Sequence, residues 1–474
     1  MANIKEILSN TNYHHVRELL TIAGKLSQST GETVYAVGGC VRDLLLGKSL
    51  SDLDLMVEGE GIQFAQNLAT ELGIKKIVPF EKFGTAFIPS KPIQIEVATS
   101  RMEVYDPDSR KPSKINYTDL HGDLKRRDFS INAMAMAIHP DNFGELTDPF
   151  GGINDLNLGI LRTPMDPDET FSDDPLRMMR AAYFASKLDF KIEPKCIRSM
   201  KKQAVRIDIV SWERIRDEFI KILSTNKPSL GLMILQRTGL MEFIFPEIHA
   251  MYGLDQTSEW HHKDIFAHTL QVVDNAAKLS NKMELRFAAL VHDIAKPNTR
   301  RIDQKKGYTF HGHDAIGEQM LNDVAERMKL PNKLSKYLKK LTLLHLRPIA
   351  LVKKEVTDSA VRRLIVASGQ VLDDLMILCR ADITTKNPKR VSRYIKNFDI
   401  VQQKMNDLVE KDAMTAFQSP VRGHEIMDIC GISEGKKVGE IKEAIEEAIL
   451  DGKIDNSYDA AKDYLLEVKD EILQ

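Results

Sequence analysis

The spacing of apolar residues changes once along the chain, near residue 150, and this change limits the folds available to it. Before that point, short apolar runs bounded by Gly, Pro or charged turns predict strands; they cover residues 34–37, 53–57, 86–88 and 93–97. Residues 1–28 are spaced as one helix. After the breaker cluster at 148–152, the apolar spacing is helical, as in 174–188, 211–223, 265–279 and 284–295. The chain is therefore predicted to be α+β, with a mixed sheet and helices first and an all-helical remainder.

The length of 474 residues predicts several domains, since single cores rarely grow beyond about 250–300 residues. Pro and Gly breakers and shifts in composition place the boundaries. We expect four parts: a head at 1–148, a helical neck at 149–245, a third helical domain at 246–400 and a more acidic helical tail at 401–474.

Composition excludes several classes of protein. The 66 Lys and Arg residues are balanced by 68 Asp and Glu residues, so any nucleic-acid binding must rest on a local basic patch. The four Cys residues form no C-x-x-C pair, which argues against a disulfide framework and a zinc knuckle. Without an apolar run of about 18 residues, we expect no membrane span and a cytoplasmic location.

Two carboxylates lie one residue apart in the second predicted strand. Asp52 and Asp54 point to the same face of a strand, while Leu53 points to the core. Clustered oxygen ligands of this kind hold pairs of divalent cations that activate a hydroxyl and neutralise a leaving pyrophosphate. Glu96, in the strand at 93–97, is either a third ligand or an outward-facing strand residue. Alone, a D-x-D pair is equally typical of a solvated strand end.

A glycine turn precedes these acids. Gly38 and Gly39 follow the first strand and open a short helix, where free N–H groups and the missing Cβ let a triphosphate approach closely. Arg42 adds a donor for a charge-assisted contact. A glycine turn and an acidic pair are each ordinary, but their combination favours a nucleotide site.

Five segments in order carry a family resemblance. Residues 38–43 (Gly-Gly-Cys-Val-Arg-Asp) with 52–54 (Asp-Leu-Asp) resemble the signature of class II tRNA nucleotidyltransferases and bacterial poly(A) polymerases, a branch of the DNA polymerase beta superfamily. The other segments resemble, in order, the family's ribose and triphosphate motif, its hinge, its base-reading motif and the helix that braces that motif; they are 126–134, 148–156, 173–180 and 213–218.

The resemblance implies a polymerase-beta-like head and a set of roles. Asp52 and Asp54 would be catalytic and bind two Mg²⁺ ions, with Glu96 as a further ligand. The nucleotide would be bound by Gly38, Gly39, Arg42, Asp43, Arg127, Asp128, Asn132, Asp174, Arg177 and Arg180. The apolar surroundings of Asn132 predict its burial, which requires polar partners. Asp173 stands where the family usually has Glu.

Asp174 and Arg177 are three positions apart in the sequence and are predicted to share one face of a helix. The plain interpretation is a surface ion pair. The family resemblance instead implies that an acceptor from Asp174 and donors from Arg177 contact the Watson–Crick edge of cytosine or adenine, with about 1–3 kcal/mol of discrimination.

Histidines and carboxylates lie among apolar neighbours in the second half. Burial of the doublet His292-Asp293 is costly without a cation or other partners. The pattern resembles an HD-type metal-dependent phosphohydrolase domain, with His268, His292, Asp293 and Asp382 as ligands and His313 and His345 as ligands of a second metal. The metal would be Mg²⁺ or a divalent transition metal. Whether the domain hydrolyses phosphate esters stays open, since some relatives are inert.

The predicted reaction is addition of CCA to tRNA 3′ ends from CTP and ATP. Lys195, Arg198, Lys201 and Lys202 would receive the RNA phosphates. Four alternatives stay open: a poly(A) polymerase, an A-adding or CC-adding half-enzyme, a phosphohydrolase with a silent head, and a non-catalytic RNA-binding module.

Overall fold

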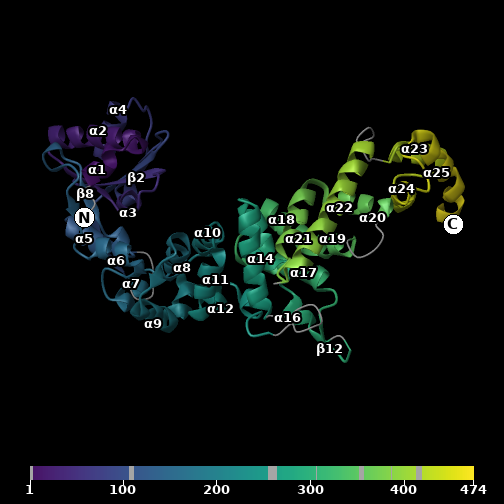
Figure 1. The fold of residues 1–474 in the computed structure, drawn as a ribbon. Coiled ribbons are helices and arrows are strands. Elements are labelled where there is room, and N and C mark those ends of the chain that lie inside the picture. Colours follow the sequence, from purple (N-terminus) through teal and green to yellow (C-terminus); the bar gives the residue numbers. More distant parts are fainter. Residues whose placement is uncertain are drawn as a thin grey trace. The chain divides into compact units, whose positions relative to one another are not determined.

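The computed structural model describes residues 4–105, 112–254, 264–305, 307–351, 357–385, 387–412 and 419–473. The chain forms two compact units, Met1–Pro246 and Glu247–Gln474 (Figure 1). None of the described helices is long and apolar enough to cross a membrane.

A seven-stranded mixed sheet forms the core of the head. The strand order is β3-β4-β5-β2-β1-β8-β9. Within this sheet β2 and β5 pair in parallel, and the other neighbouring strands pair antiparallel. The strands are β1 (Thr33–Val37), β2 (Asp52–Glu58), β3 (Val78–Phe80), β4 (Thr85–Ile88), β5 (Gln94–Thr99), β8 (Ala135–Ala137) and β9 (Leu146–Thr147). A separate hairpin joins β6 (Arg101–Tyr105) and β7 (Pro112–Tyr117). The predicted mixed sheet is confirmed.

The prediction of one continuous helix over residues 1–28 is wrong, because the described part of this segment forms two helices. A 3-10 turn over Thr11–Tyr13 separates α1 (Ile4–Ser9) from α2 (His14–Thr30). The Asn10 side chain accepts a hydrogen bond from the Asn12 N–H, and this local bond competes with continuation of the helix. The other helices of the head are α3 (Gly39–Leu45), α4 (Gly61–Glu71), α5 (Leu120–Lys125) and α6 (Gly152–Leu158).

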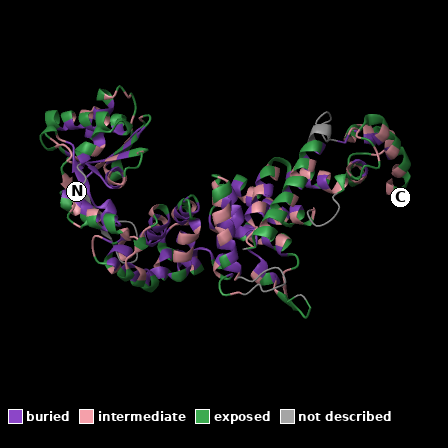
Figure 2. Cartoon of the chain, viewed as in Figure 1, coloured by how far each residue is buried: buried purple, intermediate pink, exposed green. Residues whose placement is uncertain are grey.

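The strands β2, β4 and β5 have one buried and one open face. Leu53, Ile95 and Val97 are buried, and α4 packs against β4 and β5 (Figure 2). On the other face, Asp52, Gln94 and Glu96 are exposed, and Asp54 and Phe87 are half-buried. Period-2 alternation therefore brings the acidic side chains to the open side of the sheet.

The head is followed by the helices α7 (Pro167–Asp173), α8 (Leu176–Leu188), α9 (Pro194–Gln203), α10 (Trp212–Leu223), α11 (Pro228–Arg237) and α12 (Leu240–Ile244). Two short parallel strands pair in the same region: β10 (Ile160–Leu161), before α7, and β11 (Lys191–Ile192), between α8 and α9. Asp174 lies between α7 and α8 in an extended conformation. The prediction that Asp174 shares a helix face with Arg177 is therefore wrong. Pro175 is the cause, because a residue before proline is disfavoured in the helical region.

The second unit is almost entirely helical. Its helices are α14 (Ile265–Leu279), α15 (Met283–Val291), α16 (Lys296–Thr299), α17 (His313–Arg327), α18 (Asn332–Leu344), α19 (Leu346–Leu351), α20 (Asp358–Ser368), α21 (Leu372–Ala381) and α22 (Pro388–Asp412), with a hairpin of β12 (Arg301–Asp303) and β13 (Gly307–Thr309). The helix predicted over 284–295 ends at Val291. Helix α22 continues through residue 400, so the boundary predicted there falls within a helix.

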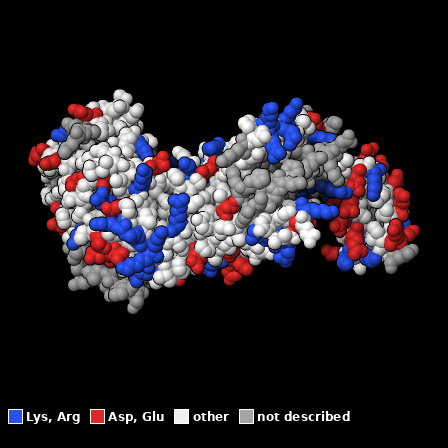
Figure 3. Space-filling model, turned by 60° about the horizontal axis from the view of Figure 1, so that its bottom comes forward, with Lys and Arg blue, Asp and Glu red and all other residues white. Residues whose placement is uncertain are grey.

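Three helices end the chain: α23 (Gly423–Cys430), α24 (Lys436–Leu450) and α25 (Tyr458–Leu473). They share a small apolar core that includes Ile426, Ile445 and Leu465. Acidic side chains are frequent on their visible surface (Figure 3). The fold class predicted from the sequence, α+β followed by helices, is confirmed.

Candidate functional site

Three carboxylates lie side by side on the open face of the sheet. In the strand register Asp54 of β2 is opposite Glu96 of β5, and Asp52 is opposite Gln94. Burial, followed by repulsion from Glu96, raises the pKa of Asp54 to about 6. This crowding of negative charge favours a divalent cation. Glu96 is exposed, as expected for an outward-facing strand residue, and its strand position is opposite Asp54; its role as a third ligand stays a prediction.

The head acids do not form a closed cage. Among the described residues, groups of three donor atoms within 4.8 Å occur at two places in the second unit and at the exposed group His14, His15 and Glu18, but not at the head acids. A magnesium ion at Asp52 and Asp54 would thus take other ligands from water and substrate phosphates, as Mg²⁺ commonly does.

The glycine turn beside the acids requires glycine for two reasons. Gly38 has φ of 75°, in the left-handed region. A Cβ atom at this position would also lie 2.5 Å from Nη1 of Arg127 and 3.7 Å from Oδ2 of Asp54. A side chain at residue 38 would therefore fill the space beside the Arg127 guanidinium and the Asp54 carboxylate.

A polar cavity of about 630 Å³ opens above this turn. Its volume is within the usual range for small-molecule sites. Its described lining includes more basic than acidic side chains. The acids are Asp52, Asp54, Asp128, Asp174, Asp217 and Glu218, and the bases are Arg42, Arg126, Arg127, Arg177, Arg180, Lys187, Arg214 and Lys221. Lys and Arg side chains also gather on the visible surface of the amino-terminal unit (Figure 3). The cavity is suited to a polyanion such as a triphosphate.

Buried polar bonds hold the floor of this cavity. Arg42 is bidentate to Asp43 at 2.8 Å and donates to Oδ1 of Asn132 at 2.5 Å. Asn132 donates in turn to Asp128 at 3.0 Å, and Asp128 accepts from Arg180 at 2.7 Å. The predicted burial of Asn132 is confirmed, and its partners are an arginine and an aspartate.

Phe184 of α8 links the same groups. Its ring centroid lies 5.1 Å from the guanidinium carbon of Arg42 and 5.3 Å from that of Arg180. The ring therefore separates two cations at cation–π distance and connects the head to the neck. Sequence reasoning missed Phe184, because a helical Phe reads as an ordinary core residue.

Asp174 and Arg177, the two residues predicted to read the base, have different hydrogen-bond partners. Asp174 accepts from Arg214 at 2.7 Å, whereas Arg177 donates to the carbonyls of Thr170 and Arg126 at 3.2 and 2.7 Å. Two of the five guanidinium N–H groups of Arg177 are thus used, and the others remain for a ligand. The predicted bracing helix, α10, contributes Arg214. Its individual role was not predicted.

A second residue missed from the sequence, Asp123 of α5, orients two cavity arginines. Its carboxylate is buried and accepts from Arg126 at 2.8 Å and from Arg127 at 2.9 Å. Burial alone would raise the pKa of Asp123, but Arg127 and Arg126 outweigh it and hold the pKa below its usual value. A lone Asp among polar residues gave no signal in the sequence.

The predicted RNA-contacting residues lie on α9. Lys195, Arg198, Lys201 and Lys202 are all exposed. Lys202 pairs with Asp168 at 2.6 Å. Helix α9 packs against α7, so these residues border the helix that precedes the base-reading segment.

In the second unit, four predicted metal ligands converge. Nε2 of His268 lies 3.0 Å from Oδ1 of Asp382, and Nε2 of His292 lies 3.1 Å from Oδ2 of Asp293. Only His268 lies within a helix; His292, Asp293 and Asp382 follow the ends of α15 and α21, which corrects the prediction of helical positions. Nε2 of His292 and Oδ1 of Asp382 are buried and lack a hydrogen bond of acceptable geometry, so both atoms fit the role of metal ligands.

The other two histidines complete a second donor group. Asp293, His313 and His345 place their donor atoms within 4.8 Å of one another, and all three are buried. Asp293 uses one oxygen toward each group, since Oδ1 lies 3.2 Å from His313 Nε2. In His292, His313 and His345, Nδ1 lies 2.6–2.9 Å from a backbone carbonyl oxygen. This contact orients each ring so that Nε2 points toward the other donor atoms of the two groups.

The pKa values of His292 and His345 are shifted in opposite directions by burial and by the charges next to them. Burial alone lowers the pKa of His292, but Asp293 outweighs it and raises the pKa to about 10. Burial, followed by His292, lowers the pKa of His345 to about 4. The donor set of four imidazoles and two carboxylates suits a divalent transition metal.

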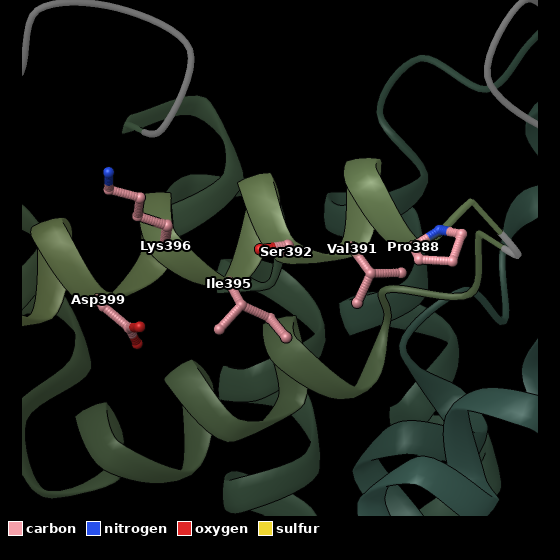
Figure 4. Close-up of a pocket in the computed structure, with 6 residues that line it drawn as sticks. All are labelled: Pro388, Val391, Ser392, Ile395, Lys396 and Asp399. Atoms are coloured by element: carbon pink, nitrogen blue, oxygen red, sulfur yellow. The ribbon is translucent and has the colours of Figure 1, made fainter.

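A further groove lies along α22 (Figure 4). It is lined by Pro388, Val391, Ser392, Ile395, Lys396 and Asp399, with Val391 and Ile395 on one side of the helix. Its described lining brings together no nucleophile and base and no metal-binding group, so it is not a candidate active site.

Three family models match successive parts of the chain. Residues 34–162 match the poly A polymerase head domain, and residues 189–252 match the probable RNA and SrmB-binding site of polymerase A. Residues 265–385 match the HD domain. The head model covers the strands that carry Asp52 and Asp54, and the HD model covers the histidine and aspartate groups of the second unit.

Relatives and solved structures agree with these models. The A-adding tRNA nucleotidyltransferase of Deinococcus radiodurans is 31% identical over 72% of this chain and 78% of that protein. The multifunctional CCA protein of Vibrio parahaemolyticus is 33% identical over 74% and 84%. The fold is similar to the CTP complex of the Bacillus stearothermophilus CCA-adding enzyme, with a TM-score of 0.66 and 23% identity over 97% of this chain and 98% of that one. The chain belongs to the family of tRNA nucleotidyltransferases and bacterial poly(A) polymerases and carries an HD domain.

Proposed function

We propose that this protein adds CCA to the 3′ ends of tRNA from CTP and ATP. The 3′-hydroxyl oxygen of the RNA bonds to the α-phosphorus of the nucleotide, the bond from that phosphorus to the bridging oxygen breaks, pyrophosphate leaves, and the hydroxyl proton passes to water. The observation that supports the proposal most is the pair Asp52 and Asp54 in a cavity whose described lining has more Arg and Lys than Asp and Glu.

Asp52 and Asp54 would hold two Mg²⁺ ions, with Glu96 as a further carboxylate. Such ions supply an activated hydroxyl and neutralise charge on the leaving pyrophosphate. The contribution of the chain is electrostatic and geometric. Gly38 and Gly39 leave space for the triphosphate, and Arg42 and Arg127 face it; Asp43, Asp128, Asn132 and Arg180 keep these groups in place.

Base choice would rest on Asp174 and Arg177. Arg214 fixes the carboxylate of Asp174, and backbone carbonyls fix the guanidinium of Arg177, so both present polar atoms in a constant arrangement. On the Watson–Crick edge, cytosine and adenine each offer an exocyclic amine and a ring acceptor, whereas the ring nitrogen of guanine and uracil on that edge carries a proton and donates. The exposed basic side chains of α9 would bind the acceptor stem.

The test uses purified protein, tRNA lacking its CCA end and labelled CTP or ATP, each alone and together. We expect incorporation of C from CTP alone and of A only after C. No incorporation from either nucleotide would reject a nucleotidyltransferase. Incorporation of A alone, onto tRNA ending in CC, would identify an A-adding enzyme like the Deinococcus relative, and long A tails would identify a poly(A) polymerase.

A second activity is favoured by the complete donor set of the HD domain. We infer that this domain binds a divalent metal and hydrolyses phosphomonoesters or cyclic phosphates of RNA ends. The test is release of phosphate from 2′-AMP, or opening of 2′,3′-cyclic AMP, by metal-loaded protein. Metal binding without hydrolysis of either compound would leave a structural role for the metal.

A further inference from the structure

A second cavity, of about 460 Å³, shares the acidic pair with the first. Its described lining is Ser51, Asp52, Asp54, Phe87, Pro92, Gln94 and Glu96. Asp52 and Asp54 are the two residues common to both described linings. The acids therefore lie at a junction between two cavities of different chemistry.

The chemistry divides by charge. The described lining of the first cavity has eight Arg and Lys side chains and six carboxylates, whereas that of the second has three carboxylates, one amide and one aromatic ring but no Lys or Arg. A triphosphate is attracted to the first and repelled from the second. The second accepts a neutral group that carries a hydroxyl, such as the ribose and base at an RNA end.

The strand register extends this surface away from the acids. Val78 of β3 is opposite Phe87 of β4, Phe87 is opposite Glu96 of β5, and Glu96 is opposite Asp54 of β2. All four residues thus lie in one row on the same face of the sheet. With strands about 4.8 Å apart, Phe87 lies about 10 Å from Asp54 along this row.

The outer end of the row is apolar and exposed. Val78 is 48% exposed and Phe80 is 50% exposed. Phe80 is opposite Thr85, two residues from Phe87 on β4, and so shares the face of Phe87. Aromatic side chains beside an acidic centre are platforms for unpaired bases, because every base has a π face.

We propose that the open face of β3, β4 and β5 binds the unpaired 3′ end of the RNA primer, with the terminal base stacked on Phe87. The proposal rests on the proposed nucleotidyl transfer. It places the attacking hydroxyl between Phe87 and the acidic pair, on the side of Glu96, while the incoming nucleotide lies among the arginines. Gln94, beside Asp52, offers an amide to the terminal nucleotide.

The kinetic test separates the two substrates. Phe87→Leu removes the ring and is expected to raise KM for tRNA about tenfold, with KM for ATP and CTP within about twofold of wild type. Phe87→Tyr keeps the ring and should restore KM for tRNA. Lys187→Ala, in the other cavity, is the matched control and should raise KM for the nucleotides instead.

The proposal fails if Phe87→Leu leaves KM for tRNA unchanged, or if Phe87→Tyr is as impaired as Phe87→Leu. Wild-type protein that transfers no nucleotide would instead reject the proposed function. A second measurement avoids variants altogether: tRNA carrying 5-iodocytidine at its 3′ terminus is irradiated with the wild-type protein, and the cross-linked peptide is sequenced. We expect a peptide from residues 78–96. Cross-links confined to residues 174–221 would overturn the proposal.

Discussion

At the scale of single residues, the environment of Asp54 makes it the least replaceable carboxylate of the head. It is more buried than Asp52, adjoins Glu96 and lines both cavities. Asp54→Asn removes one charge but keeps the shape. We expect nucleotide incorporation to fall at least 100-fold, since even changes outside the ligand shell typically cost 10- to 100-fold. Single-turnover incorporation with saturating nucleotide measures this loss, and retention of more than a tenth of the activity would contradict it.

Arg214 has a more selective effect. It holds Asp174, which the structure separates from Arg177. Arg214→Ala should reduce the preference for C and A over G and U by about 10- to 100-fold, which corresponds to the 1–3 kcal/mol of a base contact. Competition between labelled nucleotides measures the ratio. Arg216→Ala is the control, because Arg216 pairs with Asp217 on the same helix. Equal loss for all four nucleotides would argue against a role in base choice.

The ionisation of Asp123 is expected to affect the free energy of unfolding. Its pKa is held below the usual value in the folded protein, so its stabilising effect is present above pH 4 and is lost as the pH falls through the folded pKa. Asp123→Asn should lower the free energy of unfolding by about 3 kcal/mol at pH 7, as expected for a broken buried pair, and by less below pH 4. Urea unfolding at pH 7 and pH 3.5 measures both values. A difference that does not depend on pH would contradict the assignment.

At the scale of elements, the sequence predicted β1, β2, β4 and β5 and missed the hairpin of β6 and β7 and the shortest strands. The strand at 93–97 and the helix at 265–279 were predicted because their apolar spacing is regular. β8 and β9 have two or three residues each, too few for a period to appear. The sequence also pointed to the acidic pair and to the histidines and aspartates that converge in the second unit, and their roles as metal ligands stay predictions. Phe184, Arg214 and Asp123 were not predicted, because their roles depend on contacts between elements distant in sequence.

Helix α9 provides an element-scale prediction. Lys195, Arg198 and Lys201 are exposed on one helix, and their replacement by Ala should weaken tRNA binding uniformly and reduce the slope of log affinity against log salt by about 2 to 3. Filter binding at several salt concentrations measures the slope. An unchanged slope would place the RNA elsewhere.

At the scale of the molecule, the two sites belong to different compact units. His268→Ala should remove bound transition metal, measured by elemental analysis after gel filtration, and abolish any phosphatase activity. Incorporation of C and A should persist, because the head acids and the cavity lie wholly within residues 1–246. Parallel loss of both activities would show that the units depend on each other.

The acidic pair common to two cavities has a consequence for successive additions. In the proposed placement of the two substrates, a newly joined nucleotide still lies among the arginines, while the next attack requires it beside Phe87. The RNA must therefore translocate by one nucleotide past Asp52 and Asp54 in every cycle. Departure of pyrophosphate has to come first, so excess pyrophosphate should stall the enzyme between cycles rather than during bond formation.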